Sequence, residues 1–409
     1  MSYALSSLTG FFSSRSYKPL VEKDEILPLE LWKLIIDYII DEIRHPYRYC
    51  TAATFPQYQA RFNLADKIEK DPTLGYWKSI RSVCRTWRQL AGHQPHLFLQ
   101  RVPKDDTRQE MSKAAFSAIV HGNNQERAIM QSLVLDPSLS HKLTTLILSQ
   151  DAHRHGIDVV LENPSSFPNL RCLSVVSTRT RQPFWEAIQN GYPQLVSLTI
   201  RNYVGNSGGA YKLNHLEILD LDSWMHFRLS CPSLKHIAVR NGRGGPLTEF
   251  LMEHGHHIES ILIDGNVLIP AVAQRHDLGS TFPKIQTFGR QAGMPIWEPL
   301  RGYPIKHLRV FPRHNYLDVE GILKEVDLFT EVTTVHVRPA DLKSGTMGEL
   351  RARFQERSIQ VVDVPNIRPV SDSKLPSIMS WLGVICTCPC WSIMLMCTPI
   401  SNRVSRTKR

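Results

Sequence analysis

Few residue clusters in this chain have the types and spacing that catalysis or metal binding requires. The run HGHH, residues 254–257, offers imidazoles, but no further ligand follows at metal-site spacing, so we expect surface histidines. Cys386, Cys388 and Cys390 stand too close together in CTCPC to supply four tetrahedral zinc ligands. The chain carries no Gly-rich phosphate loop and no G-x-S-x-G elbow. The sequence therefore predicts a protein that is not an enzyme and needs no metal or cofactor.

Length and composition indicate a folded chain of several parts. The chain has 409 residues, of which 42% are hydrophobic and 21% are charged, as in ordinary folded proteins. This length suits two or more domains or one elongated repeat array. The net charge of +10 is spread widely, so we interpret it as a solubility feature and expect no nucleic-acid partner.

Cysteine usage and the N-terminus bear on the compartment. Cys50, Cys84, Cys172 and Cys231 are widely separated, which indicates buried free thiols and no disulfide framework. The first residues lack a basic stretch followed by an apolar core, so we see no secretory signal and expect cytoplasm or nucleus.

Two apolar patterns near the N-terminus predict helices. The first begins near Pro28, and its apolar residues cover almost the whole helix circumference: Leu31, Trp32, Leu34, Ile35, Ile36, Tyr38, Ile39, Ile40 and Ile43. Such a helix must be buried on more than one side, and a partner is the natural second cover. The second spans 78–90 and has an apolar face opposite three arginines. The apolar face consists of Ile80, Val83, Cys84, Trp87 and Leu90. An ordinary helix pair inside a larger domain is the alternative interpretation.

Together the two patterns resemble an F-box. Leu27, Pro28 and Glu30 match the family's Leu-Pro-x-Glu start, and its Val-Cys-x-x-Trp helix is matched by Val83, Cys84, Arg85, Trp87 and Leu90. One departure is the long segment 41–74 between the halves, which we interpret as an inserted surface loop with one short helix at 62–70.

The resemblance implies a helical module that docks on a Skp-family adaptor, which a cullin-based ubiquitin ligase holds in turn. The adaptor-binding residues carried over by match are Leu27, Pro28, Leu31, Ile35, Val83, Cys84 and Trp87. Trp87 is either an interface hot spot or part of the module's own core, and both interpretations stay open.

A repeated motif follows a helical stretch at 108–131. The pattern is apolar, two variable, apolar, one variable, apolar; it begins at Leu143, Leu170, Leu195, Leu216, Leu234, Ile258, Ile285, Ile305, Val332 and Ile359. The average interval of 24 residues lies in the range of leucine-rich repeats. Several units open with an aromatic residue or Cys before Pro, as in FPNL at Phe167. The seventh unit departs from the pattern, with Arg290 in its last apolar slot.

These units resemble the irregular leucine-rich repeats that follow F-boxes, and a conventional β-sandwich or α/β domain is the alternative. Because side chains alternate along a strand, those that point away from the core would line the concave face, and they include Ser197, Thr199 and Asp264. Our substrate-binding candidates on this face are Arg201, Asp220, Asp222, His236, Arg240, His307, Arg309, His336 and Arg338. Such faces bind extended protein surfaces. The alternative is a solvated strand face without a partner.

The tail is uncharged from Leu375 to Asn402 and ends in basic residues. Its length suits a membrane anchor, although Pro389 and Pro399 interrupt it. S-acylation through its cysteines, and an apolar cap or a poorly ordered end, are the other two interpretations.

The expected fold class is α+β, with a small helical F-box-like module followed by a leucine-rich-repeat-like α/β solenoid of about ten units. We expect a disordered leader at 1–23, the module at 24–92, a helical linker at 93–131, the solenoid at 132–370 and the tail at 371–409. The expected function is substrate recognition for a Skp-cullin-F-box ubiquitin ligase. An interaction scaffold without a ligase role, attached to a membrane by its tail, is the alternative.

Overall fold

The structure is a computed structural model. It describes residues 29–62, 96–99, 101–120, 125–148, 155–175, 183–201, 209–224, 228–242, 244–264, 281–293, 302–312, 316–343 and 345–364.

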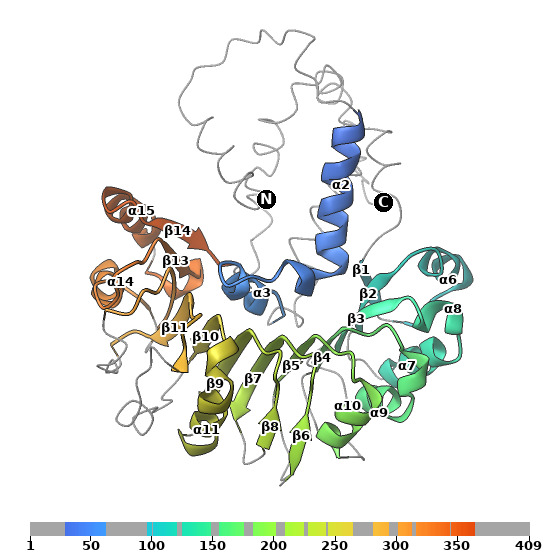
Figure 1. Ribbon diagram of the computed structural model, residues 1–409. Coiled ribbons are helices and arrows are strands. Elements are labelled where there is room, and N and C mark those ends of the chain that lie inside the picture. Colours follow the sequence, from blue (N-terminus) through green and yellow to red (C-terminus); the bar gives the residue numbers. More distant parts are fainter. Residues whose placement is uncertain are drawn as a thin grey trace, which may run out of the picture.

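The described fold is mixed α/β and is dominated by one 12-stranded parallel sheet that bends into an arc (Figure 1). The strands follow one another in sequence order, and every neighbouring pair is parallel. Their bounds are β1 His96–Leu99, β2 Phe116–Val120, β3 Leu143–Leu148, β4 Cys172–Val175, β5 Ser197–Ile200, β7 Ile218–Trp224, β9 His236–Gly242, β10 Ser260–Ile263, β11 Thr287–Gln291, β12 His307–Phe311, β13 Thr334–Val337 and β14 Gln360–Asp363. A separate two-stranded sheet joins β6 Ala210–Lys212 to β8 Arg228–Ser230.

Each of the ten repeated motifs forms one strand of this sheet, as the spacing predicts. In the first nine motifs the central apolar residues lie side by side in neighbouring strands and are buried. This column runs Leu146, Leu173, Leu198, Leu219, Ile237, Ile261, Phe288, Leu308 and Val335. Because each unit contributes only a few such residues, the core exists only when the strands stack.

The Pro-containing segments before the strands are tight turns. In each, the backbone N–H of the motif's first residue donates to the carbonyl of the residue before Pro, as from Leu170 to Phe167 at 3.1 Å and from Leu234 to Cys231 at 3.1 Å. Proline suits the second position of such a turn because its φ is already fixed there. The residues before Pro, including Tyr192 and Phe282, are buried in the core.

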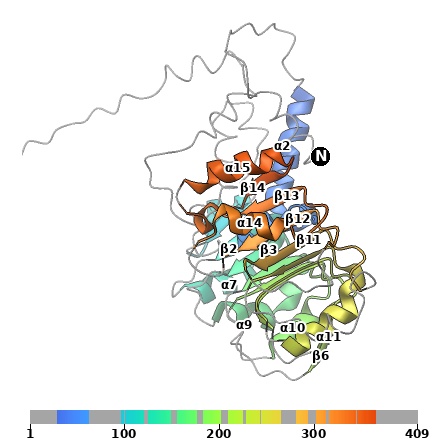
Figure 2. The same ribbon diagram turned by 90° about the vertical axis from the view of Figure 1, so that its left-hand side faces the viewer.

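Helices cover the convex side of the arc (Figures 1 and 2). They are α6 Asp105–Met111, α7 Glu126–Val134, α8 Pro137–Ser140, α9 His155–Glu162, α10 Phe184–Gly191, α11 Gly244–His254, α14 Val319–Val326 and α15 Thr346–Glu356, with short 3-10 turns η4 Pro164–Ser166, η5 Gly255–His257 and η7 Pro339–Asp341. On the concave side lie α2 Leu29–Arg44, η2 Pro46–Tyr49 and α3 Phe55–Phe62.

One expectation about this part of the chain is wrong. The predicted helical linker at 93–131 contains β1 and β2, so the sheet begins before the first recognised motif. Arg290, which breaks the seventh motif, is buried and pairs with buried Glu325 of α14 at 3.1 Å. The last position of the seventh motif therefore holds one residue of a buried ion pair, whereas the other motifs have an apolar residue there. The predicted helix at 78–90 lies outside the described residues.

Candidate functional site

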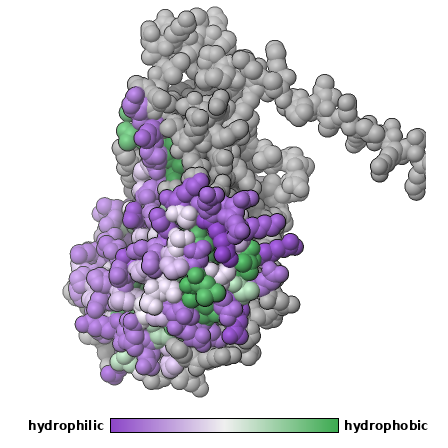
Figure 3. Space-filling view, turned by 90° about the vertical axis from the view of Figure 1, so that its right-hand side faces the viewer, coloured by the Kyte–Doolittle hydropathy of each residue, from purple (hydrophilic) through white to green (hydrophobic). Residues whose placement is uncertain are grey.

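Helix α2 leaves part of its apolar surface open. Ile36 and Ile40 are buried, whereas the exposed fractions of Leu31, Leu34 and Ile35 are 43%, 64% and 37%. Figure 3 shows apolar surface on this helix where it stands away from the sheet. Of the adaptor-binding candidates, Leu31 and Ile35 therefore lie on the surface. The others, Leu27, Pro28, Val83, Cys84 and Trp87, fall outside the described residues.

Polar and aromatic contacts fix the turn at the C-terminal end of α2. The hydroxyl of Tyr49 donates to the Asp41 carboxylate at 2.6 Å, and the Tyr49 ring meets Tyr38 edge-on at 5.0 Å. Burial and the neighbouring carboxylate raise the pKa of Tyr49, because both disfavour a phenolate. The Arg48 guanidinium lies 3.6 Å from the same carboxylate. This turn directs the following residues onto the sheet.

Residues 47–60, which we call the strap, cross the concave face of the sheet (Figure 1). Thr51 and Thr54 first form a turn with two reciprocal backbone-to-hydroxyl bonds of 2.9 and 3.3 Å. Helix α3 then begins at Phe55, with Pro56 in its first turn, where the missing N–H costs no helical bond. Phe55 and Tyr58, three residues apart, share one face of α3.

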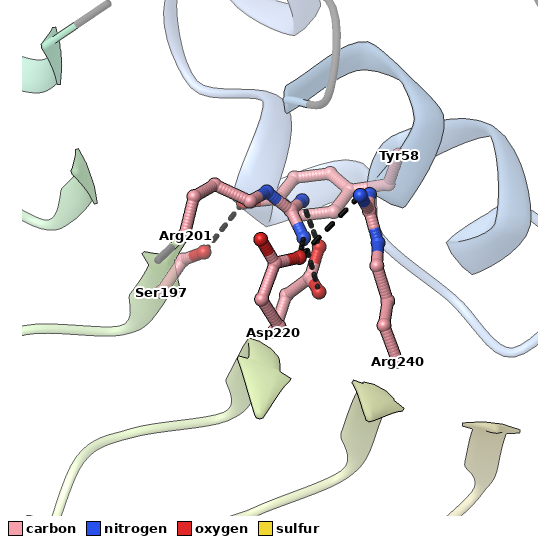
Figure 4. Close-up of polar contacts among 6 residues, drawn as sticks. Tyr58, Ser197, Arg201, Asp220 and Arg240 are labelled. Atoms are coloured by element: carbon pink, nitrogen blue, oxygen red, sulfur yellow. Dashed lines mark hydrogen bonds and ion pairs between the residues drawn. The ribbon is translucent and has the colours of Figure 1, made fainter. Parts of the chain in front are cut away.

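Three contacts hold the strap to strands that are far apart in the sheet. The hydroxyl of Thr287 in β11 donates to the Ala52 carbonyl at 2.5 Å. The ring of Phe55 stacks on His236 of β9, with the ring centres 5.2 Å apart. A hydrogen bond of 2.6 Å joins the hydroxyls of Tyr58 and Ser197 in β5, drawn in Figure 4.

The strap and the sheet enclose a second apolar cluster, separate from the core under the convex helices. Phe55 is fully buried and Tyr58 is 7% exposed. The cluster consists of Tyr47, Phe55, Tyr58, Ile119, Ile147, Cys172, Ile218, Ala238, Leu262 and Phe311. The prediction of a surface loop is therefore wrong for residues 47–60. The helix expected at 62–70 lies outside the described residues except for Phe62, the last residue of α3.

Charged residues beside the strap form a paired network at the carboxyl ends of the strands (Figure 4). Arg201 donates to Asp220 at 2.7 Å and to Asp222 at 3.0 Å. Arg240 of β9 lies 3.4 Å from the same Asp222. Burial lowers the pKa of Arg201, but the charges of Asp220 and Asp222 outweigh burial and raise it. Arg201 and Asp220 are buried, while Asp222 and Arg240 keep part of their side chains at the surface.

The network continues toward the C-terminal strands. Arg309 donates to the Asp341 carboxylate at 3.0 Å and to the His336 carbonyl at 3.0 Å. Arg338 donates to the same carboxylate at 2.8 Å. Burial lowers the pKa of Arg309 to about 10, and burial raises the pKa of nearby Asp264.

The predicted concave-face charges therefore balance. The arginines are Arg201, Arg240, Arg309 and Arg338, and the aspartates beside them are Asp220, Asp222, Asp264 and Asp341. Each of these arginines has an acidic neighbour.

The three histidine candidates are buried rather than displayed. His236 shares a hydrogen bond of 3.0 Å with the Ser260 hydroxyl, and the rings of His307 and His336 lie 6.1 Å apart. Burial lowers the pKa of His236 and of His336 to about 3, since a charged imidazole would lose its hydration. All three therefore stay neutral at neutral pH.

Among the residues that the structure describes, no group of three or more His, Cys, Asp or Glu side chains is arranged for a metal ion. In the HGHH run, His254 is buried, and its ring nitrogen accepts a hydrogen bond of 3.4 Å from the backbone N–H of Cys231. The expectation of a surface histidine is thus wrong for His254.

Within the described residues, no helix is both long and apolar enough to span a membrane. The uncharged tail, 375–402, lies outside them, so its three interpretations stay predictions.

Comparisons with known proteins give no family assignment. No protein-family model matches the chain, and no curated protein matches it.

Proposed function

We propose that the chain is the substrate-recognition subunit of a Skp-cullin-F-box type ubiquitin ligase. On this proposal, α2 belongs to an F-box-like module that docks on a Skp-family adaptor, and the sheet belongs to a leucine-rich-repeat-like solenoid. The observation that carries the proposal is the exposed apolar surface of Leu31, Leu34 and Ile35 on α2. An exposed cluster of large apolar side chains on one helix is typical of a protein-binding surface. It lies where the Leu-Pro-x-Glu pattern places the first F-box helix.

The repeat interpretation is supported by one parallel strand for each of the ten motifs and by helices on the convex side. A conventional sandwich would pack two sheets face to face, whereas the described strands belong to one large sheet and one small one. In this arrangement the protein supplies proximity and orientation, and other subunits supply the covalent chemistry.

Among the substrate-binding candidates, three keep side-chain surface open to a partner. The exposed side-chain fractions are 20% for Asp222, 29% for Arg240 and 38% for Arg338. These residues lie on three strands, β7, β9 and the end of β13, along the carboxyl edge of the sheet. We propose this edge as the substrate contact, since the remaining candidates are buried.

The test is binding of the full chain to a purified Skp-family adaptor. The variant Leu31→Ala/Leu34→Ala removes two exposed leucines of α2. Leu135→Ala is the control, because Leu135 directly follows α7 and is 82% exposed. We expect the double variant to weaken binding at least about tenfold, as loss of one interface hot spot does. The control should bind like the unmodified chain.

Failure of the folded full chain to bind the adaptor would remove the ligase proposal and leave the interaction scaffold. The substrate edge has its own test. Arg240→Ala/Arg338→Ala should change the set of captured proteins without changing adaptor affinity. An unchanged set would refute the edge as the substrate contact.

A further inference from the structure

The apolar core is incomplete at β14, the last strand of the described sheet. Val361 of β14 lies beside Val335 of β13 and continues the buried column of apolar residues. Every earlier member of that column, Val335 included, is buried, whereas Val361 is only half-buried. Ile359 is likewise only partly buried against the core. One more layer of apolar side chains would therefore complete the core at this end.

The backbone of β14 also has one side without a neighbour among the strands that the structure describes. On the other side, the N–H of Gln360 donates to β13 at 2.9 Å, and the N–H of Val364 donates to the carbonyl of Val337 at 2.8 Å. Backbone groups of successive residues alternate between the two sides of a parallel strand, so Val361 and Asp363 direct theirs away from β13. Such an edge can accept one further parallel strand, and proteins usually cover edges of this kind.

The sequence after β14 contains the turn that precedes other strands of this sheet. The turns FPNL at Phe167 and CPSL at Cys231 place Pro second and end on the first residue of a motif. The tail begins with the same arrangement, LPSI at 375–378. In the described units the column residue follows three positions after the turn, and the residue in that position here is Trp381. Trp381 follows Val361 at the same spacing that separates two described members of the column, Phe288 and Leu308.

We infer that residues 375–383, which lie outside the described residues, form a further repeat unit that covers the open edge of β14. The unit consists of a turn at 375–378 and a strand at 380–383 that pairs with β14 in parallel. Trp381 then lies beside Val361 and extends the buried column, and Leu382 lies beside Val362. The connection 364–374 is long enough, because a shorter one, 225–230, joins β7 to the turn at Cys231.

This assignment divides the uncharged tail into two parts. Its first part, 375–383, belongs to the sheet, where an uncharged sequence suits burial. The remainder, 384–402, contains both Pro389 and Pro399 and is short for a membrane span. The inference goes beyond the proposed function, because it rests on the stacking of the strands and not on the Skp-family adaptor.

The experiment is hydrogen–deuterium exchange of the full chain without lipid or detergent, read at single residues by fragmentation in the mass spectrometer. We expect the amide hydrogens of 380–383, Val361 and Asp363 to exchange at least about a hundredfold more slowly than in an unstructured peptide of the same sequence. Free exchange at 380–383, in a chain whose strand β13 is protected, would overturn the inference. Protection of 380–383 only after addition of phosphatidylcholine vesicles would assign this segment to a membrane and would also overturn it.

Two tryptophans of the tail provide a matched pair of variants. Trp381→Ser removes the proposed core residue, whereas Trp391→Ser makes the same change in the same uncharged segment beyond the proposed unit. We expect Trp381→Ser to speed exchange at Val361 and Asp363 at least about tenfold and Trp391→Ser to leave it unchanged. Equal effects of the two variants would indicate unspecific apolar cover, and protection lost on hundredfold dilution would indicate a strand from a second copy. Either result would overturn the inference, and neither measurement involves the adaptor.

Discussion

Phe55→Ala should destabilise the whole sheet and not only the strap. Phe55 is fully buried, and its ring stacks on His236 in the middle of the concave face. Truncating a buried Phe to Ala costs about 3–5 kcal/mol, as transfer and cavity contributions combined. The unfolding entropy is about 2.1 cal/mol/K per residue, so for 409 residues we expect Tm to fall by about 3.5–6 °C.

Urea unfolding followed by far-UV circular dichroism measures this loss. The midpoint should fall while the slope stays unchanged, since the variant exposes a similar surface when it unfolds. Leu135→Ala, at an exposed leucine, is the control and should change stability by less than about 0.5 kcal/mol. If Phe55→Ala unfolds like this control, the strap does not share the cooperative unit of the sheet, and our interpretation of the second cluster is refuted.

Three further predictions concern buried ionisable groups. Burial lowers the pKa values of His236 and His336 from 6.5 to about 3, so the contribution of these residues to stability is complete above pH 6.5. Urea titrations should show that this contribution is lost as pH falls toward 3. A pH-independent midpoint between pH 7 and pH 4 would contradict this. Burial raises the pKa of Glu126 from 4.5 to about 8, so its contribution is present below pH 4.5 and is lost as pH rises through 8. Glu126→Gln should therefore stabilise the protein at pH 9 by a few kcal/mol and change little at pH 4, and an equal effect at both pH values would refute the assignment. Glu325→Leu, which leaves buried Arg290 without its carboxylate, should cost about 3–5 kcal/mol, whereas Arg290→Leu/Glu325→Leu should restore most of that stability in the same assay. A double variant as unstable as the single one would show that the site needs the ions.

The sequence alone predicts the strands because their signal is local. Each motif places a buried apolar residue such as Leu173 or Leu198 at the same position, and identical positions stack. The strands β1 and β2 were missed because the segments that form them, near His96 and Phe116, do not carry the motif.

The sequence contains a signal for the charge pairs, but the alternation of side chains along a single strand does not reveal it. Arg201, Asp222, Arg240 and Asp264 occupy the same position after four successive motifs, with alternating sign. Since equivalent positions lie side by side in a parallel sheet, this alternation predicts that neighbouring charges pair. Comparing signs between successive units would have found the network.

The strap could not be located from local patterns. Residues 47–60 contain four aromatic side chains, Tyr47, Tyr49, Phe55 and Tyr58, which is unusual for a solvated loop and signals burial. Nothing in the segment says what buries Phe55 and Tyr58, because their partners His236 and Ser197 lie more than a hundred residues away in sequence.

The bond between Ala52 and Thr287 has a consequence for how the chain folds. Its partners are 235 residues apart, whereas neighbouring strands of the sheet are joined by short connections. During synthesis the strap leaves the ribosome long before β11 is made, so until then its aromatic residues lack part of the surface that buries them. Contacts of such large sequence separation slow folding, because the entropy of closing the long loop is lost before they form. We therefore expect the early strands to assemble as the chain emerges and the strap to close last, which makes the newly made N-terminal segment the part of this protein most in need of a chaperone.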